Sequence, residues 1–146
     1  MIEIRKYDRQ GDVAKSVYAV MKSVYPTSPW SLEQIRVDMA KEDTTYYLAY
    51  EEKNVVGFLA VQLLLDEMEI LQIAVHTDFQ RCGIASRLLD CLGDWVGPIF
   101  LEVRASNHSA QSLYTRQHFI QIGKRKDYYH NPIEDAVIMM RRKDER

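Results

Sequence analysis

Short stretches in which apolar and polar residues alternate recur along the chain, a pattern typical of strands with one buried face. Other stretches are short apolar runs rich in the residue types that strands favour. Together they predict about seven strands, at Ile2–Tyr7, Thr44–Glu52, Val55–Leu65, Met68–Val75, Ile99–Val103, Phe119–Lys126 and Ala136–Met140. The second, third and fourth are separated only by the candidate turns Lys53-Asn54 and Asp66-Glu67. We therefore expect these three to be consecutive antiparallel strands.

Apolar residues at helical spacing predict two helices in the first half of the chain. The first follows Asp12, a candidate N-cap, and its inner face is Val13, Val17, Val20, Met21 and Val24. In the second, Ser31 and Gln34 can form a capping box. Trp30 and Ile35 around that start can form a hydrophobic staple, and Leu32 and Met39 extend the inner face.

Two more helices are expected in the second half. One has Ile84, Leu88, Cys91, Leu92 and Trp95 on one face and ends at Gly97-Pro98. The other follows Asn107 and contains Ala110, Leu113 and Tyr114. Strands that alternate with helices after a meander imply a mixed sheet with helices on both faces. We therefore predict one α/β (or α+β) domain over residues 1–146.

Composition narrows the class of protein further. The chain has 146 residues, 47% of them apolar and 27% charged, a normal globular balance. Its 19 Lys and Arg against 21 Asp and Glu argue against nucleic-acid binding through bulk positive charge. We expect neither a signal peptide at the start nor a membrane span, because no apolar run approaches the length of a span. The two cysteines suggest reduced thiols. We expect a cytoplasmic protein without a metal site, with Arg141–Arg146 as a solvated charged end.

The segment Leu71–Ser86 is the most informative for chemistry. A strand-like run ends, a short loop follows, and a helix opens at Gly83. The unpaired N–H groups of a helix start suit a phosphate, Gly83 lacks the Cβ that would keep a pyrophosphate away, and Arg81 adds a cation. An ordinary turn is the alternative interpretation. The glycine patterns of P-loops and dinucleotide folds are missing.

The hexapeptide Gln80-Arg81-Cys82-Gly83-Ile84-Ala85 resembles the Gln/Arg-x-x-Gly-x-Gly/Ala signature of the GCN5-related N-acetyltransferases (GNAT). The resemblance continues over nearly the whole chain, in Pro29-Trp30-Ser31, Leu101–Asn107, Leu113-Tyr114, Tyr128-Tyr129 and Glu134–Met139. This set is similar to the RimI branch, whose members acetylate the N-terminal alanine of a small-subunit ribosomal protein. It implies transfer by direct attack in a ternary complex, with a monomer or weak dimer as the working form.

The resemblance also implies a twisted sheet that splays between its fourth and fifth strands, with acetyl-CoA in the opening. The backbone of Ile73, Ala74 and Val75 would contact the pantetheine arm and the thioester. The pyrophosphate would be held by Arg81, Cys82, Gly83, Ile84, Ala85 and Ser86. Asn107 would contact the cofactor beside the thioester.

Acetyl transfer needs an amine without its proton and a proton for the departing thiolate. Exposing a neutral amine at pH 7 costs about 3.5 kcal/mol less for an α-amine than for lysine, which favours an α-amine. By resemblance Glu102 is the general base, and Tyr114 is the general acid. The alternatives are a Glu102 that pairs with Arg104 or faces water, and a Tyr114 that is an ordinary core residue.

Other residues have two interpretations each. Tyr128 and Tyr129 line a peptide channel or pack in a hairpin, and Trp30 forms the opposite lip or only a staple. Asp66, Glu67 and Glu69 attract a basic peptide or occupy a solvated turn. Ala85 stands where the family more often has glycine, and so does His118, so we expect the helix before Phe119 to close differently.

Three functions remain open from the sequence. One is N-terminal acetylation of a ribosomal protein. Another is acetylation of lysine, small amines or a broader set of N-termini. The last is a non-catalytic acyl-CoA sensor, which the joint presence of an acid and a base disfavours.

Overall fold

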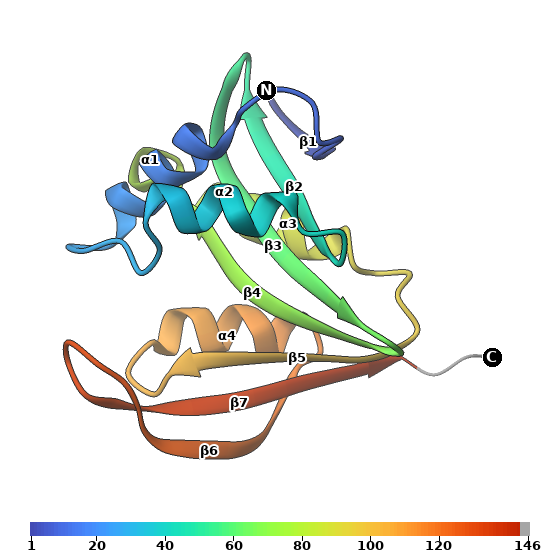
Figure 1. Cartoon of the computed structure of the whole chain (residues 1–146). Coiled ribbons are helices and arrows are strands. Elements are labelled where there is room, and N and C mark those ends of the chain that lie inside the picture. The colour runs from blue at the N-terminus through green and yellow to red at the C-terminus, as the bar shows by residue number, and fades with distance from the viewer. Residues whose placement is uncertain (144–146) are drawn as a thin grey trace. The chain divides into compact units, whose positions relative to one another are not determined.

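The computed structural model describes residues 1–143. Its seven strands form a mixed sheet in the order β1-β2-β3-β4-β5-β7-β6 (Figure 1). The strands are β1 (Ile2–Lys6), β2 (Thr44–Glu51), β3 (Asn54–Leu64), β4 (Glu67–Val75), β5 (Gly97–Arg104), β6 (Ile120–Tyr129) and β7 (Glu134–Lys143). The helices are α1 (Ala14–Val24), α2 (Leu32–Ala40), α3 (Ile84–Asp90), α4 (His108–Arg116) and the 3₁₀ turn η1 (Thr77–Phe79). The predicted mixed sheet and its helices are confirmed.

The chain divides into two compact units. The first, here the amino-terminal unit, comprises residues 1–63 and 71–94, and the second, the carboxy-terminal unit, comprises residues 64–70 and 95–146. The β3–β4 hairpin therefore contributes to both units. That the whole chain forms one domain stays a prediction.

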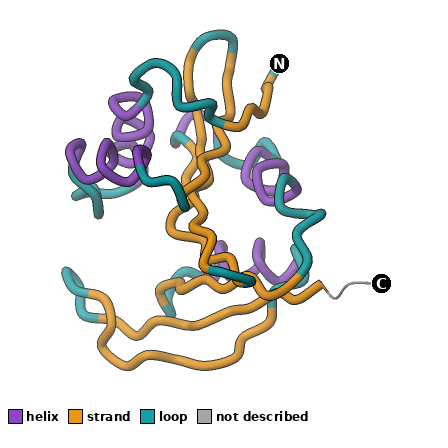
Figure 2. The backbone as a smooth tube through the Cα atoms, turned by 45° about the vertical axis from the view of Figure 1, so that its right-hand side comes forward, coloured by secondary structure: helices purple, strands orange, loops and turns teal. Residues whose placement is uncertain are grey.

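In the amino-terminal unit, α1 and α2 cover one face of the strands and α3 covers the other (Figures 1 and 2). The core beneath α1 and α2 consists of Ala14, Val17, Val20, Met21, Ile35, Met39, Tyr46, Leu48, Phe58, Ala60 and Ala74. The Tyr46 hydroxyl donates a hydrogen bond of 2.6 Å to Asp38, which satisfies the polar end of this buried ring. On the other face Arg87 of α3 donates to the carbonyl of Ile2, at 2.9 Å.

Local sequence signals account for the start of α2. The Ser31 hydroxyl accepts a hydrogen bond from the Gln34 N–H, and the Gln34 side chain accepts one from the Ser31 N–H. The predicted capping box is therefore confirmed. Helix α1 has Val13 as its N-cap, one residue later than predicted. Asp12 still contributes to this helix start, since its carboxylate accepts a hydrogen bond from the Ala14 N–H.

Helix α3 is shorter than predicted. It ends at Asp90, and turns replace the helix before β5 begins at Gly97. Cys91 is exposed, so the prediction that it belongs to the buried face is wrong. The buried positions are Ile84, Leu88, Leu89 and Leu92.

In the carboxy-terminal unit, β7 pairs antiparallel with both β5 and β6, and β6 is the edge strand. Side chains alternate along β5: Leu101 and Val103 are buried, and Glu102 projects from the opposite face. The parallel ladder of β4 with β5 consists of two partner pairs, Met68 with Ile99 and Glu69 with Phe100.

Two expectations are corrected, one about the end of the chain and one about the end of helix α4. Arg141–Lys143 belong to β7, and Arg141 is half-buried, so a solvated position is wrong for Arg141, whereas Arg142 and Lys143 are exposed as expected. Residues 144–146 lie outside the described part of the chain. Helix α4 closes in the left-handed conformation with His118 at φ +72°, and the Phe119 N–H donates to the Tyr114 carbonyl. The expectation of a different closure is therefore wrong, and a residue with a Cβ bears the strain of a position that suits glycine.

Candidate active site

The loop that follows β4 is fastened to the end of that strand. The His76 N–H donates to the Val56 carbonyl on β3 at 2.8 Å, and the Gln80 side chain donates to the Val75 carbonyl at 3.0 Å. Between them η1 turns the chain, and the His76 ring accepts from the Asp78 N–H at 3.1 Å. These bonds give the loop one defined path into α3.

The entry to α3 has the geometry that a phosphate requires. Gly83 has φ +78°, and a Cβ built on it would meet no atom within 4 Å, so space is open beside it. The first intrahelical bond joins the Arg87 N–H to the Gly83 carbonyl, which leaves the N–H groups of residues 84–86 outside the helical ladder. Arg81 is exposed at this mouth. Backbone donors, an exposed guanidinium and open space together fit the pyrophosphate of a nucleotide-tailed cofactor.

The other residues predicted here lie where the strand and helix place them. Ala74 and Val75 are buried, at 7% and 8% exposure, Ile73 is half-buried, and Cys82 is exposed. Ala85 and Ser86 are half-buried in the first turn of α3, and Ile84 is buried. Their roles toward a cofactor stay predictions.

Gly57 was missed by sequence reasoning. A Cβ on this β3 residue would lie 3.2 Å from the Ala74 carbonyl oxygen and 3.4 Å from Ile84. Its lack of a side chain therefore permits β3, the end of β4 and α3 to pack closely. The available signal was a glycine inside an apolar strand run, which often marks close approach of another backbone.

Glu102 is half-buried on β5 in the carboxy-terminal unit. Its side chain is 24% exposed, and Arg125 Nε on β6 lies 3.8 Å from its Oε2. That oxygen is buried and has no hydrogen-bond partner among the described residues. A carboxylate oxygen in this state is free to accept a hydrogen bond from a donor.

The alternative pairing of Glu102 with Arg104 is wrong. Arg104 instead pairs with Glu134 at 3.3 Å and donates to the carbonyls of His130 and Pro132. Its guanidinium also lies over the Tyr129 ring at 4.5 Å. Arg104 thus holds the β6–β7 turn.

Glu69 on β4 lies near Glu102. It is half-buried in β4, and burial raises the pKa of its carboxyl; the negative charge of Glu102 raises that pKa further, and Arg125 opposes the shift. A solvated turn therefore describes Asp66 but is wrong for Glu69. The overlooked signal was a carboxylate between the apolar residues Met68 and Ile70.

The two tyrosines at the end of β6 have different neighbours. Burial raises the pKa of Tyr128, and the charge and hydrogen bonding of Glu102 raise it further. The Tyr128 and Tyr129 rings meet edge to face, with centroids 5.0 Å apart. The hairpin packing is therefore present, and Tyr128 in addition borders Glu102.

Tyr114 and Asn107 lie at α4, one within the helix and one at its start. Tyr114 is 6% exposed, and its ring lies edge-on to Phe119 with centroids 5.8 Å apart. The Asn107 side-chain oxygen accepts from the Ala110 N–H at 3.1 Å and so caps the helix. The acid role of Tyr114 and the cofactor contact of Asn107 stay predictions.

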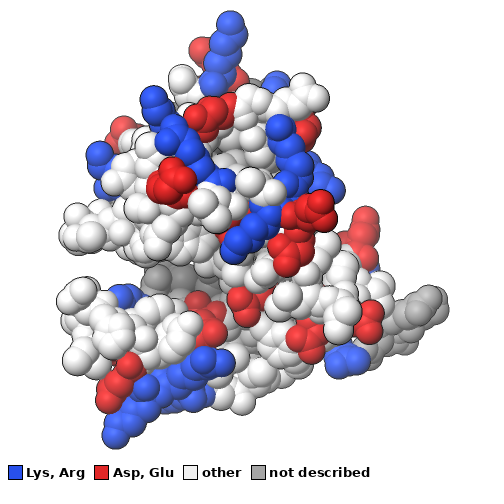
Figure 3. Space-filling model, viewed as in Figure 1, with Lys and Arg blue, Asp and Glu red and all other residues white. Residues whose placement is uncertain are grey.

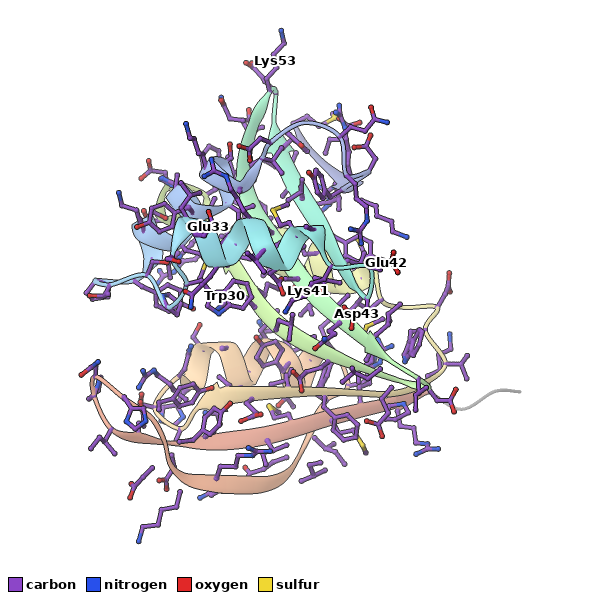
Figure 4. All side chains as sticks on the ribbon, viewed as in Figure 1. Trp30, Glu33, Lys41, Glu42, Asp43 and Lys53 are labelled. Atoms are coloured by element: carbon purple, nitrogen blue, oxygen red, sulfur yellow. The ribbon has the colours of Figure 1, made fainter. Side chains whose placement is uncertain are left out.

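Trp30, labelled in Figure 4, lies beside the start of α2 and packs against the core of the amino-terminal unit. Ile35, the residue expected to pair with Trp30 in a hydrophobic staple, belongs to that core. Its role as a lip of the substrate site stays a prediction. Among residues 1–143, no group of three or more His, Cys, Asp or Glu side chains is arranged to hold a metal ion. None of the helices described is long and apolar enough to cross a membrane.

A mixed sheet in this strand order, a turn after β4 that suits a phosphate, and a buried carboxylate oxygen without a hydrogen-bond partner on β5 together point to a group-transfer enzyme. The model of the Acetyltransferase (GNAT) family matches residues 14–119, and the chain belongs to this family.

Similar proteins include the ribosomal protein bS18-alanine N-acetyltransferase of Haemophilus ducreyi, which is 41% identical over 97 residues, or 61% of this chain and 67% of that one. The crystal structure of the ribosomal-protein-S18-alanine N-acetyltransferase from Escherichia coli has a TM-score of 0.89 and 28% identity, covering 100% of this chain and 96% of that one. The crystal structure of a GNAT family acetyltransferase from Elizabethkingia anophelis with acetyl-CoA bound has a TM-score of 0.75 and 19% identity, over 97% of this chain and 98% of that one. This likeness supports the fold.

Proposed function

We propose that this protein transfers the acetyl group of acetyl-CoA to the α-amine of the N-terminal alanine of ribosomal protein bS18. The observation that carries the proposal is likeness over 100% of the chain to the Escherichia coli enzyme of that activity, at a TM-score of 0.89. The 41% identity to the Haemophilus ducreyi enzyme supports the same substrate. Because the proposed substrate is a ribosomal protein, we expect the protein to act in the cytoplasm, as a monomer or weak dimer.

The residues at the start of α3 suit the pyrophosphate of acetyl-CoA. Arg81 and the N–H groups of residues 84–86 would hold it, and open space beside Gly83 would admit it. Acetyl-CoA bound there supplies the acetyl group as a thioester. The backbone of residues 73–75 is the proposed contact for its pantetheine arm.

Glu102 is the proposed proton acceptor. An α-amine is mostly protonated at pH 7, and only its neutral form attacks a thioester carbon. The buried Oε2 of Glu102, which has no partner among the described residues, takes that proton directly or through a water molecule. The hydroxyl of Tyr114 is the proposed donor of a proton to the departing thiolate.

The test is an acetylation assay with peptides. Purified protein and acetyl-CoA are incubated with a bS18 amino-terminal peptide that begins Ala-Arg, and both free thiol and peptide mass are measured. The control is the same peptide with a blocked α-amine and one internal lysine. Acetylation of the free α-amine alone supports the proposal. Product only on lysine or small amines contradicts the substrate, and cofactor binding without any product contradicts the enzyme activity.

A further inference from the structure

Glu69 lies on the same face of the sheet as Glu102. In the parallel ladder, Glu69 on β4 is the partner of Phe100 on β5. Residues two positions apart on a strand share a face, so Glu102 follows Phe100 on that face. The two carboxylates are close enough that the charge of Glu102 raises the pKa of Glu69.

Positive charge at this pair comes from Arg125. Its Nε is 3.8 Å from Glu102 Oε2, and its guanidinium lies 5.4 Å from the centre of the Tyr128 ring. The Arg125 side chain is 58% exposed, so water and salt screen its charge. Figure 3 shows Lys and Arg side chains gathered where β6 and β7 run. Lys124, Arg125 and Lys126 of β6 are exposed.

The charges do not balance when both carboxylates are ionised. Two negative groups then face one guanidinium, whose nearer partner is Glu102. The ion pairs found among residues 1–143 do not include Glu69. A half-buried carboxylate without an ionic partner is stabilised when a cation binds beside it.

The proposed substrate brings such a cation. An α-amine has a pKa of about 7.7–8.0, so most of it is ammonium at pH 7. This ammonium must approach Glu102 to lose its proton, and it thereby comes to the face that Glu69 shares.

We propose that Glu69 binds the protonated α-amine of the acceptor peptide and holds it beside Glu102, so that the site selects a cationic chain end. This inference rests on the proposed function. Glu69 is then a specificity-determining residue, whereas Glu102 takes the proton.

The kinetic test uses Glu69→Gln, with Glu67→Gln as the matched control. Glu67 is exposed two residues earlier on the same strand, so the control removes the same charge. We expect Glu69→Gln to raise the KM for an Ala-Arg peptide about tenfold, with kcat within about twofold and the KM for acetyl-CoA unchanged. The control should change none of these. An unchanged peptide KM would overturn the inference, and so would a hundredfold fall in kcat, which would make Glu69 the proton acceptor.

A binding test separates this inference from the proposed function. Calorimetry compares the peptide with its N-acetylated form, each titrated into protein that contains coenzyme A. Wild type should prefer the free amine about tenfold, and Glu69→Gln should lose this preference. A preference that is absent in wild type or persists in the variant overturns the inference, whether or not the peptide is acetylated. If the preference depends on Glu69 but wild type acetylates no α-amine, the proposed function alone fails.

A second peptide identifies the cation. Its residue 2 is Gln in place of Arg, and the α-amine is unchanged. The loss of affinity in Glu69→Gln should be the same for both peptides. A loss confined to the Arg peptide would assign Glu69 to that side chain and overturn the inference.

Discussion

Replacing Glu102 with Gln separates proton transfer from structure at this site. The amide has the shape of the carboxyl group but cannot accept the amine's proton. The substitution removes the carboxylate whose buried Oε2 has no hydrogen-bond partner among the described residues. Loss of a general base lowers kcat by about 10²–10⁴, which is about 2.7–5.4 kcal/mol in the activation barrier.

The same substitution should hardly change the free energy of unfolding. The ion pair with Arg125 is 3.8 Å long and its Arg side chain is 58% exposed, so its loss costs about 0–1 kcal/mol. Relief of the repulsion with Glu69 offsets part of that cost. Glu102→Gln should therefore be nearly inactive at pH 7 and about as stable as wild type.

The assay is steady-state acetylation of the Ala-Arg peptide between pH 6 and 9.5, with urea unfolding of each protein in parallel. The variant depends on amine that is already neutral, so its rate should rise about tenfold per pH unit up to the amine pKa near 8. Glu67→Gln serves as the control for loss of a glutamate charge. A kcat for Glu102→Gln within threefold of wild type at pH 7 would refute the assignment of Glu102 as the base.

Four further outcomes are expected. Tyr114→Phe should lower kcat about ten- to several-hundred-fold, and wild-type turnover across the pH range would remove Tyr114 from the mechanism. Gly83→Ala and Gly11→Ala should each cost about 1–2 kcal/mol of stability, because both positions have φ near +75°. The added Cβ meets no atom within 4 Å at either position, so this backbone conformation is the only cost. By calorimetry only Gly83→Ala should also weaken acetyl-CoA binding, by about tenfold, and equal affinities would argue against a cofactor at this turn. His118→Gly should stabilise the protein by about 0.5–1 kcal/mol in urea unfolding, since it relieves the φ of +72°, and lower stability would show that the His118 side chain contributes more than the strain costs. The fourth outcome concerns pH. Because the folded-state pKa of Glu69 is raised, its contribution to stability is fully present below its unfolded value near 4.5 and is lost as pH rises through the folded value. Glu69→Gln should therefore match wild type in urea midpoint at pH 4 and exceed it at pH 7, and an equal difference at both pH values would contradict a raised pKa.

Features encoded by neighbouring residues could be predicted from the sequence. The capping box of α2 joins residues three apart, and the cap of α4 joins Asn107 to Ala110, so both follow from local residue types. The turn at Gly83 is similar, because a strand end, a glycine and a helix start are consecutive in the chain. Glu102 could be proposed because a carboxylate is unusual in an apolar strand.

Features that depend on strand order could not be predicted. Glu69 and Arg125 lie far from Glu102 in the sequence, and only the β4–β5 and β5–β7–β6 pairings bring the three together. The exposure of Cys91 and the partial burial of Arg141 likewise depend on where a helix ends and where a strand continues.

The amino-acid sequence alone determined the family and the order of helices and strands, and it supplied the candidate residues for binding a phosphate and accepting a proton. These properties depend on residue type and on spacing within a few positions. The tertiary structure decided the charge environment of Glu102, the proposed base, because Coulomb interactions depend on distance in space and not along the chain. It placed Arg125 rather than Arg104 beside Glu102, and the β4–β5 register brought a second carboxylate, Glu69, to the same face.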